Sequence, residues 1–267
     1  MISSPSVLVT VCAAALLCAA CGSADDSQPG DKASGTDATQ PSDPAAPPPA
    51  PPATTSAAPA PPPSDYEVEK AYAEAHGVVI EPGKVTVVAK RRGADALSTT
   101  YDDTLVVFRS DGTIARFAGT TKPAQMPVPG SSIVPDVDGD GRKDLGIVRP
   151  GVYRAHGGTS YGVPGYERSA FKVTTETDDP DLPAWRDLTG DGVYSASEKM
   201  LAEQRSYTID GIYIHYGFAP AGTTLGADTY IGPWSVGCQN VQYKELDDFV
   251  QAVGGADATF RYAIVHD

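Results

Sequence analysis

The sequence predicts a mainly β domain with a few helices, preceded by a long segment that does not fold. Short runs rich in β-branched and aromatic residues recur between residues 84 and 266, which is typical of strands. Turn residues such as Asp111-Gly112 separate these runs. Residues 22–64 contain almost no large apolar side chains, so they cannot bury enough surface to offset the entropy of ordering. About 200 residues remain for the folded part, which suits a single domain.

The first 21 residues predict an export signal. They hold an apolar run of the length of a signal-peptide core, followed by small residues, and the run is shorter than the ~20 apolar residues of a membrane span. Ala19-Ala20 before Cys21, with Gly22-Ser23 after it, resemble the cleavage motif of bacterial lipoproteins. We therefore predict lipidation of Cys21 and an exported, membrane-anchored protein of the cell envelope. Cys18 stands where that motif usually has Leu, so the alternative is a secreted protein cut at an Ala-x-Ala-like site.

Residues 22–64 predict a disordered tether. The second half of this segment is rich in Pro and Ala and favours stiff polyproline II. At about 3.1 Å per residue where it is extended, the tether would span on the order of 100 Å. Such a length would let an anchored domain reach a cell-wall layer.

The chain is acidic, with a formal net charge of −14 and a sequence pI near 4.6. Nucleic-acid phosphates would be repelled by this charge, so we expect no nucleic-acid partner. The charge suits a solvated envelope protein and, where Asp residues cluster, cation binding.

Folded structure is expected to begin at Ser64. Ser64 and Glu67 read as a capping box, and Gly77 is a natural stop, which gives an N-terminal helical segment over 65–82. A second helix is predicted over 243–255, where Gly254-Gly255 ends it. The predicted strands are 84–90, a hairpin over 103–119 that turns at Ser110-Asp111-Gly112, 145–155, 169–176, 206–217 and 259–266.

The stretch GPWSVGCQN at 232–240 contains Cys238, the only cysteine beyond residue 21. An unpaired thiol in an exported chain is either reactive or deeply buried. Gly237 permits a tight turn, and its backbone N–H and that of Cys238 are candidate oxyanion donors. The helix that begins near Tyr243 is expected to place its positive N-terminal dipole behind the thiol. His215, at the end of a predicted strand, is the candidate base, and Gly217 would leave room for a substrate.

These residues resemble the catalytic signature of the L,D-transpeptidase catalytic-domain family. There, a strand end carrying a histidine is followed by Ser/Thr-His-Gly-Cys-x-Asn/Arg. On that pattern His215 falls on the general base, Ser235 on the Ser/Thr, Gly237 and Cys238 on the Gly and the nucleophile, and Asn240 on the polar residue beyond.

The sequence departs from that signature at two points. Val236 stands where the family has its second histidine. The gap between His215 and Ser235 is longer than usual, and we expect its residues 219–230 to cover a substrate.

The resemblance extends over 83–267 and implies a β-sandwich or barrel with an N-terminal helix and a helix after the catalytic cysteine. It implies that Cys238 attacks an amide of a peptidoglycan stem peptide, with His215 as base and a thioester intermediate. Asn240, Gly217 and His156 would contact the substrate. No cofactor is implied for catalysis, and we expect a monomer. The acceptor, an amine or water, stays open, so a hydrolytic carboxypeptidase or amidase is an alternative.

A second alternative is a non-catalytic, calcium-stabilised module that binds the cell wall. Cys238 would then be a buried small residue and His215 a structural strand histidine. Val236 is the sequence feature that favours this alternative.

Two acidic loops have the ligand spacing of a calcium loop of the EF-hand kind. One spans 136–147 and lacks the closing acid, because Ile147 holds the twelfth position. The other spans 187–198 and closes with a glutamate. We predict that each holds a structural Ca²⁺, with solvated Asp-Gly loops as the alternative. The predicted ligands are Asp136, Asp138, Asp140 and Asp144 in the first loop, and Asp187, Thr189, Asp191, Val193 and Glu198 in the second.

Overall fold

A computed structural model describes residues 63–124, 134–161, 167–217 and 235–267, all of which belong to one compact unit, Pro59–Asp267. The predicted signal segment with Cys21, the tether up to residue 62 and residues 219–230 lie outside the described residues. No helix of the described residues is long and apolar enough to cross a bilayer.

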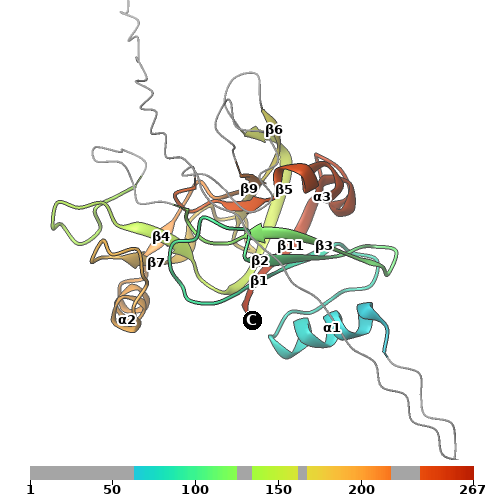
Figure 1. The fold of residues 1–267 in the computed structure, drawn as a ribbon, viewed down its shortest axis with the longest axis horizontal. Helices are drawn as coiled ribbons and strands as arrows, with labels where there is room; N and C mark the ends of the chain where they lie inside the picture. The colour runs from blue at the N-terminus through green and yellow to red at the C-terminus, as the bar shows by residue number, and fades with distance from the viewer. Residues whose placement is uncertain (1–62, 125–133, 162–166, 218–234) are drawn as a thin grey trace, which may run out of the picture. The chain divides into compact units, whose positions relative to one another are not determined.

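A closed barrel forms most of this unit (Figure 1). Its strands are β1 (Thr86–Arg91), β2 (Asp103–Phe108), β3 (Ile114–Thr120), β5 (Gly151–Tyr161), β6 (Arg168–Thr174), β9 (Tyr213–Tyr216), β10 (Gln239–Val241) and β11 (Thr259–His266). Their order around the barrel is β1-β11-β5-β6-β9-β10-β3-β2. Neighbours are antiparallel except for β1 with β11 and β9 with β10, which are parallel. The predicted mainly β class is confirmed.

A second, three-stranded sheet has the order β4-β7-β8, from β4 (Leu145–Val148), β7 (Leu182–Asp187) and β8 (Thr208–Ile209). Helix α2 (Ala196–Arg205) packs on it through a small cluster of Ile147, Trp185, Tyr194 and Ala202. Figure 1 shows α2 beside β4 and β7. Neither α2 nor β7 was among the elements predicted from the sequence.

Two predicted strands are each divided between the two sheets. The 145–155 strand is β4 and β5, which separate at Arg149-Pro150. Proline has no N–H to continue a ladder, and Arg149 N–H instead donates to Pro183 O at 2.9 Å. The 206–217 strand is β8 and β9, which separate at Asp210-Gly211, where Gly211 has a φ of +66°. These separations place the edge of the small sheet next to β9 and β10.

Helix α1 (Asp65–Ala75) begins where the sequence predicts. Ser64 Oγ accepts a hydrogen bond from Glu67 N–H at 3.3 Å, which satisfies one of the open donors of the first turn. The helix packs on apolar side chains of β1, β2 and β11, and Lys90 of β1 forms an ion pair with Glu69 at 2.6 Å. The N-terminal helical segment is thus part of the barrel unit.

The barrel interior is apolar and is covered by α3 (Leu246–Val253), which follows a 3₁₀ turn, η1 (Tyr243–Glu245). Phe249 of α3 is fully buried and makes edge-to-face contacts with Phe117, Phe171 and Phe260. This helix confirms the prediction of a helix after Cys238. The core anchors β9 and β10, the two strands that carry the candidate site.

Candidate functional site

The parallel pair β9–β10 brings the two candidate catalytic residues onto adjacent strands. His215 lies in β9, opposite Asn240 of β10, and Cys238 directly precedes β10. A backbone hydrogen bond from Tyr213 reaches the thiol. Cys238 and His215, 23 positions apart in the sequence, are therefore held by one ladder.

His215 is held as a neutral imidazole. It is 4% exposed, and Nδ1 lies 2.6 Å from the carbonyl oxygen of Tyr216. A carbonyl only accepts hydrogen bonds, so Nδ1 carries the proton and Nε2 keeps a lone pair. Nε2 is buried and has no hydrogen-bond partner among the residues that the structure describes. Burial lowers the pKa of His215 to about 4, although the bond to Tyr216 acts in the opposite direction. This is the tautomer and charge state of a general base.

Cys238 is held as a neutral thiol. It is 8% exposed, and Sγ lies 3.8 Å from the carbonyl oxygen of Gly211. Burial raises its pKa to about 11. The helix does not begin directly after the thiol: strand β10 follows Cys238 along the chain, and α3 starts at Leu246. Both groups are therefore neutral, and the described residues show no hydrogen bond between the thiol and the imidazole.

Ser235 and Asn240 fix the turn that carries Cys238. Ser235 Oγ donates to the Cys238 carbonyl oxygen at 2.7 Å, and Asn240 Nδ2 donates to the same oxygen at 3.2 Å. Gly237 has a φ of +146°, a conformation that favours glycine. Its N–H donates to Ser235 Oγ at 3.4 Å and so contributes to the turn, and its role as an oxyanion donor stays a prediction.

A cavity of about 380 Å³ opens onto Cys238. One wall is the 206–212 segment, with β8, and the other is Val134, Pro135 and Val137. Asp181, Arg186 and Asp210 give the cavity charges of both signs. His215 does not line it, so Cys238 is the point where the cavity meets the β9–β10 pair.

The other predicted substrate residues lie elsewhere. Gly217 N–H donates to Val241 O at 3.2 Å and so continues the β9–β10 ladder. His156, in β5, contacts Asp178 at 3.0 Å and Thr174 at 3.2 Å through Nε2. Neither His156 nor its two partners line the cavity next to Cys238, and the structure does not bring His156 to it.

Tyr161 is a site residue that sequence reasoning missed. Its ring stacks on that of His215, with centroids 4.2 Å apart. Burial raises the pKa of Tyr161, and so does the charge that Cys238 would carry as a thiolate. Tyr161 therefore lies beside both candidate catalytic groups. Nothing in the sequence separates it from the chain's 13 tyrosines.

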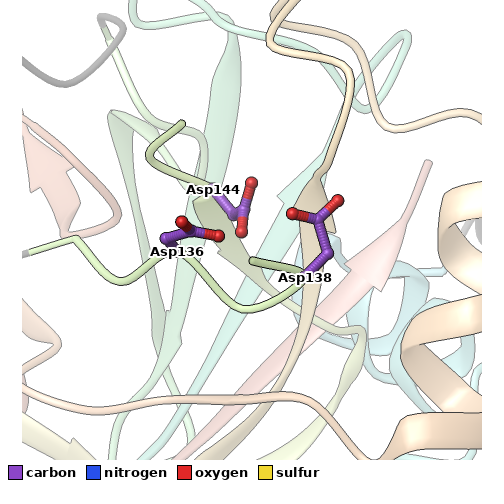
Figure 2. Close-up of side chains that lie close together, drawn as sticks. All are labelled: Asp136, Asp138 and Asp144. Atoms are coloured by element: carbon purple, nitrogen blue, oxygen red, sulfur yellow. The ribbon is translucent and has the colours of Figure 1, made fainter. Parts of the chain in front are cut away.

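In the first acidic loop, Asp136, Asp138 and Asp144 converge (Figure 2). Each offers a carboxylate oxygen, and these atoms lie within 4.8 Å of one another. Asp140 does not join them. Its carboxylate accepts from Arg142 Nε at 2.6 Å, and this hydrogen bond is the first cause of the lowered pKa of Asp140.

In the second acidic loop, residues 187–198, the carboxylates of Asp187 and Glu198 accept hydrogen bonds from groups of the same loop. Glu198 Oε1 accepts from Leu188 N–H and from the N–H and hydroxyl of Thr189, and Oε2 accepts from the N–H and hydroxyl of Ser195. Asp187 accepts the N–H groups of residues 190, 191 and 192. Ser195 and Glu198 form the capping box of α2. We name residues 187–198 the Glu198 clasp; its calcium stays a prediction.

Comparisons with known proteins identify no relative. No protein-family model matches the chain, no curated protein matches it, and no solved structure matches it.

Proposed function

We propose that this protein is an exported cysteine acyl-transfer enzyme of the L,D-transpeptidase type, acting on peptidoglycan stem peptides. The observation that carries the proposal is the placement of Cys238, at a cavity, beside the strand of a buried histidine whose Nε2 has no hydrogen-bond partner among the described residues. A thiol nucleophile needs a base with a free lone pair, and the Nδ1 bond to Tyr216 leaves His215 in that form. The lipid anchor on Cys21 and the tether over 22–64 belong to the same proposal and would hold the enzyme at the envelope.

The proposed reaction begins with both groups neutral. Cys238 Sγ attacks the carbonyl carbon of an amide in the stem peptide while its proton passes to His215 Nε2. When the C–N bond breaks, the imidazolium returns that proton to the leaving amine, and a thioester remains on Cys238. An acceptor amine then forms a new amide and restores the thiol, whereas water gives a free carboxylate.

The pKa values of Cys238 and His215 indicate at which stage of the reaction the thiol proton is transferred. A gap of about 7 separates the pKa of the thiol from that of the imidazole. At 1.36 kcal/mol per unit, a resting thiolate–imidazolium pair would lie roughly 10 kcal/mol above the neutral pair before the attraction between the two charges is counted, and that attraction narrows the difference. Proton transfer is therefore expected to accompany the attack on the substrate and not to precede it.

Ser235, Asn240 and Tyr161 serve as positioning residues in this proposal. Ser235 and Asn240 donate hydrogen bonds to the carbonyl oxygen of Cys238. They thereby fix the direction in which the Cys238 side chain points. Tyr161 stacks on the imidazole and limits its rotation. Since reacting atoms must approach within about 3–3.5 Å, small displacements of the thiol are expected to slow the reaction.

The experiment is incubation of the full chain with muropeptides released from peptidoglycan by a muramidase, followed by mass analysis of the products. The wild type and His76→Gln, an exposed helix-end histidine, should give cross-linked or trimmed muropeptides. Cys238→Ala should give none while keeping its melting temperature within a few degrees. Full activity of Cys238→Ser would contradict the proposal.

A second candidate function is the non-catalytic wall-binding module. It is favoured by the burial of both groups, because the buried neutral thiol is also what a structural cysteine looks like. This function predicts that the wild type pellets with purified cell walls, that Cys238→Ala pellets equally well, and that no muropeptide is altered.

A further inference from the structure

The carboxylates of the first acidic loop leave a buried oxygen without a partner. Asp144 is 1% exposed, and its Oδ1 has no hydrogen-bond partner in the described part of the chain. Its Oδ2 accepts from Val137 N–H at 2.5 Å. Asp136 and Asp138 approach it from the start of the loop, as Figure 2 shows. Three carboxylates thus share a small volume, and one of their oxygens is fully desolvated.

Such an arrangement is unfavourable without a cation. Burial raises the pKa of Asp144, and the charges of Asp138 and Asp136 raise it further. Two guanidinium groups lie near these carboxylates, and neither donates to a carboxylate of the three. Arg186 donates to the backbone oxygens of Asp144, at 3.0 Å, and of Thr208, and Arg142 is engaged elsewhere. It donates to Asp140, to Thr189 O at 2.9 Å and to Leu188 O at 3.0 Å.

The geometry of the three carboxylates suits calcium. Two oxygens that bind one Ca²⁺ at about 2.4 Å are at most about 4.8 Å apart. The three ligand atoms satisfy that limit. Gly139 and Gly141, with φ of +84° and +90°, allow the chain to turn around the site. Both Asp136 oxygens accept backbone N–H bonds, from Gly139 at 2.6 Å and Gly141 at 2.9 Å, which orients them while leaving each a second lone pair.

The same loop forms a wall of the cavity next to Cys238. Pro135 and Val137 flank Asp136 and line that cavity. Asp144 holds both of them, since its N–H donates to Pro135 O at 2.8 Å and its carboxylate accepts from Val137 N–H. A cation on Asp144 would therefore act on the cavity wall through two hydrogen bonds.

We propose that Asp136, Asp138 and Asp144 bind one Ca²⁺, completed by backbone and water oxygens, and that this ion fixes the Val134–Val137 wall of the Cys238 cavity. Asp140 is outside the ligand set, which corrects the wider set predicted from the spacing. The site does not depend on the proposed function, and its test measures no turnover.

The test is calorimetric titration of the chelator-treated full chain with CaCl₂. We expect one ion to be lost in Asp138→Asn and in Asp144→Asn, and to be kept in Asp248→Asn, the control at an exposed aspartate of α3. Asp138 is exposed, so Asp138→Asn removes a negative charge and one of the two ligand oxygens without disturbing the core, and the affinity should fall strongly. In Asp144→Asn the amide oxygen can still accept from Val137. Absence of binding at millimolar Ca²⁺, or binding that survives Asp138→Asn and Asp144→Asn, would overturn the site.

The effect on the wall is measured by the rate at which iodoacetamide alkylates Cys238, followed on the peptide that contains it. Saturating Ca²⁺ should slow alkylation at least threefold in the wild type and leave the rate unchanged in Asp138→Asn. An equal rate with and without Ca²⁺ in the wild type would overturn the coupling to the cavity. Because alkylation needs no substrate peptide, its outcome is separate from that of the acyl-transfer assay.

Discussion

The Glu198 clasp and the β9–β10 pair are both buried and polar, but they differ in how their polar atoms are satisfied. Glu198 is 5% exposed, and its two oxygens accept five hydrogen bonds. His215 is 4% exposed, and its Nε2 accepts none. A satisfied network rigidifies the structure around it, whereas an unpaired buried atom keeps its capacity to bind a proton or a ligand. We therefore assign structure to the clasp and chemistry to the strand pair.

The largest effect expected from this comparison is on activity. His215→Gln should lower the rate of muropeptide turnover by about 10²–10⁴-fold, because general base catalysis contributes on that order. The unfolding free energy near pH 7 should fall by only about 1–2 kcal/mol, because the Nδ1 bond to Tyr216 and the stack on Tyr161 are lost while Nε2 loses no bond. Turnover assays and urea unfolding on the same preparation measure the two effects.

A large loss of stability with unchanged specific activity in His215→Gln would reverse the assignment. His76→Gln, at the exposed end of α1, is the control histidine and should change neither quantity.

The next effect is the dependence of stability on pH. The pKa of His215 is about 4 in the folded chain, below its ordinary 6.5, so the unfolded chain binds the proton more readily between these values. Stability is then fully present above pH 6.5 and is lost as the pH falls toward 4. By linkage, about 2 kcal/mol should be lost through His215 between pH 7 and pH 5.

Urea unfolding of the wild type and His215→Gln at pH 7 and pH 5 isolates this contribution. The wild type should lose more stability than the variant by that amount. Equal losses in the two proteins would show that His215 is not buried as a neutral group.

The smallest effect concerns the clasp. Glu198→Gln replaces Oε2, which accepts from both Ser195 groups, with an amide nitrogen that cannot accept. Loss of the capping box and of these bonds should lower the unfolding free energy by about 2 kcal/mol. Activity per folded molecule should be unchanged.

Glu203→Gln is the matched control, since it lies in the same helix and its side chain is 53% exposed. It should change stability by less than about 0.5 kcal/mol. A loss of activity in Glu198→Gln that exceeds the loss of folded protein would contradict a purely structural role of the Glu198 clasp.

Local signals in the sequence predicted local structure. The Ser64 cap and the Asp111-Gly112 turn lead to α1 and the β2–β3 hairpin as expected, because each depends on residues within one turn. The closing of the barrel joins β1 to β11, from opposite ends of the domain, and no local pattern encodes that pairing. Strand β10 escaped prediction because its three residues include two polar ones, Gln239 and Asn240, and show no alternation.

The sequence pattern of the Glu198 clasp fits two different local structures. Glu198 fits the twelfth position of a calcium loop and also the fourth position of a capping box that starts at Ser195. Interpreting the pattern as a calcium loop leaves helix α2 unpredicted. Cys238 and His215 stood out as candidates because their residue types are rare in this chain, and their catalytic roles stay a prediction. Tyr161 was missed because only the fold brings it to His215.

The central claim is that Cys238 forms a covalent thioester. Its most direct test is the intact mass of the full chain, quenched in acid within seconds of mixing with muropeptides. We predict an added mass equal to the acyl part of the muropeptide, located at Cys238 by peptide mapping and absent from Cys238→Ala. Turnover of muropeptides with no adduct at any time point, or an adduct that persists in Cys238→Ala, would contradict the claim.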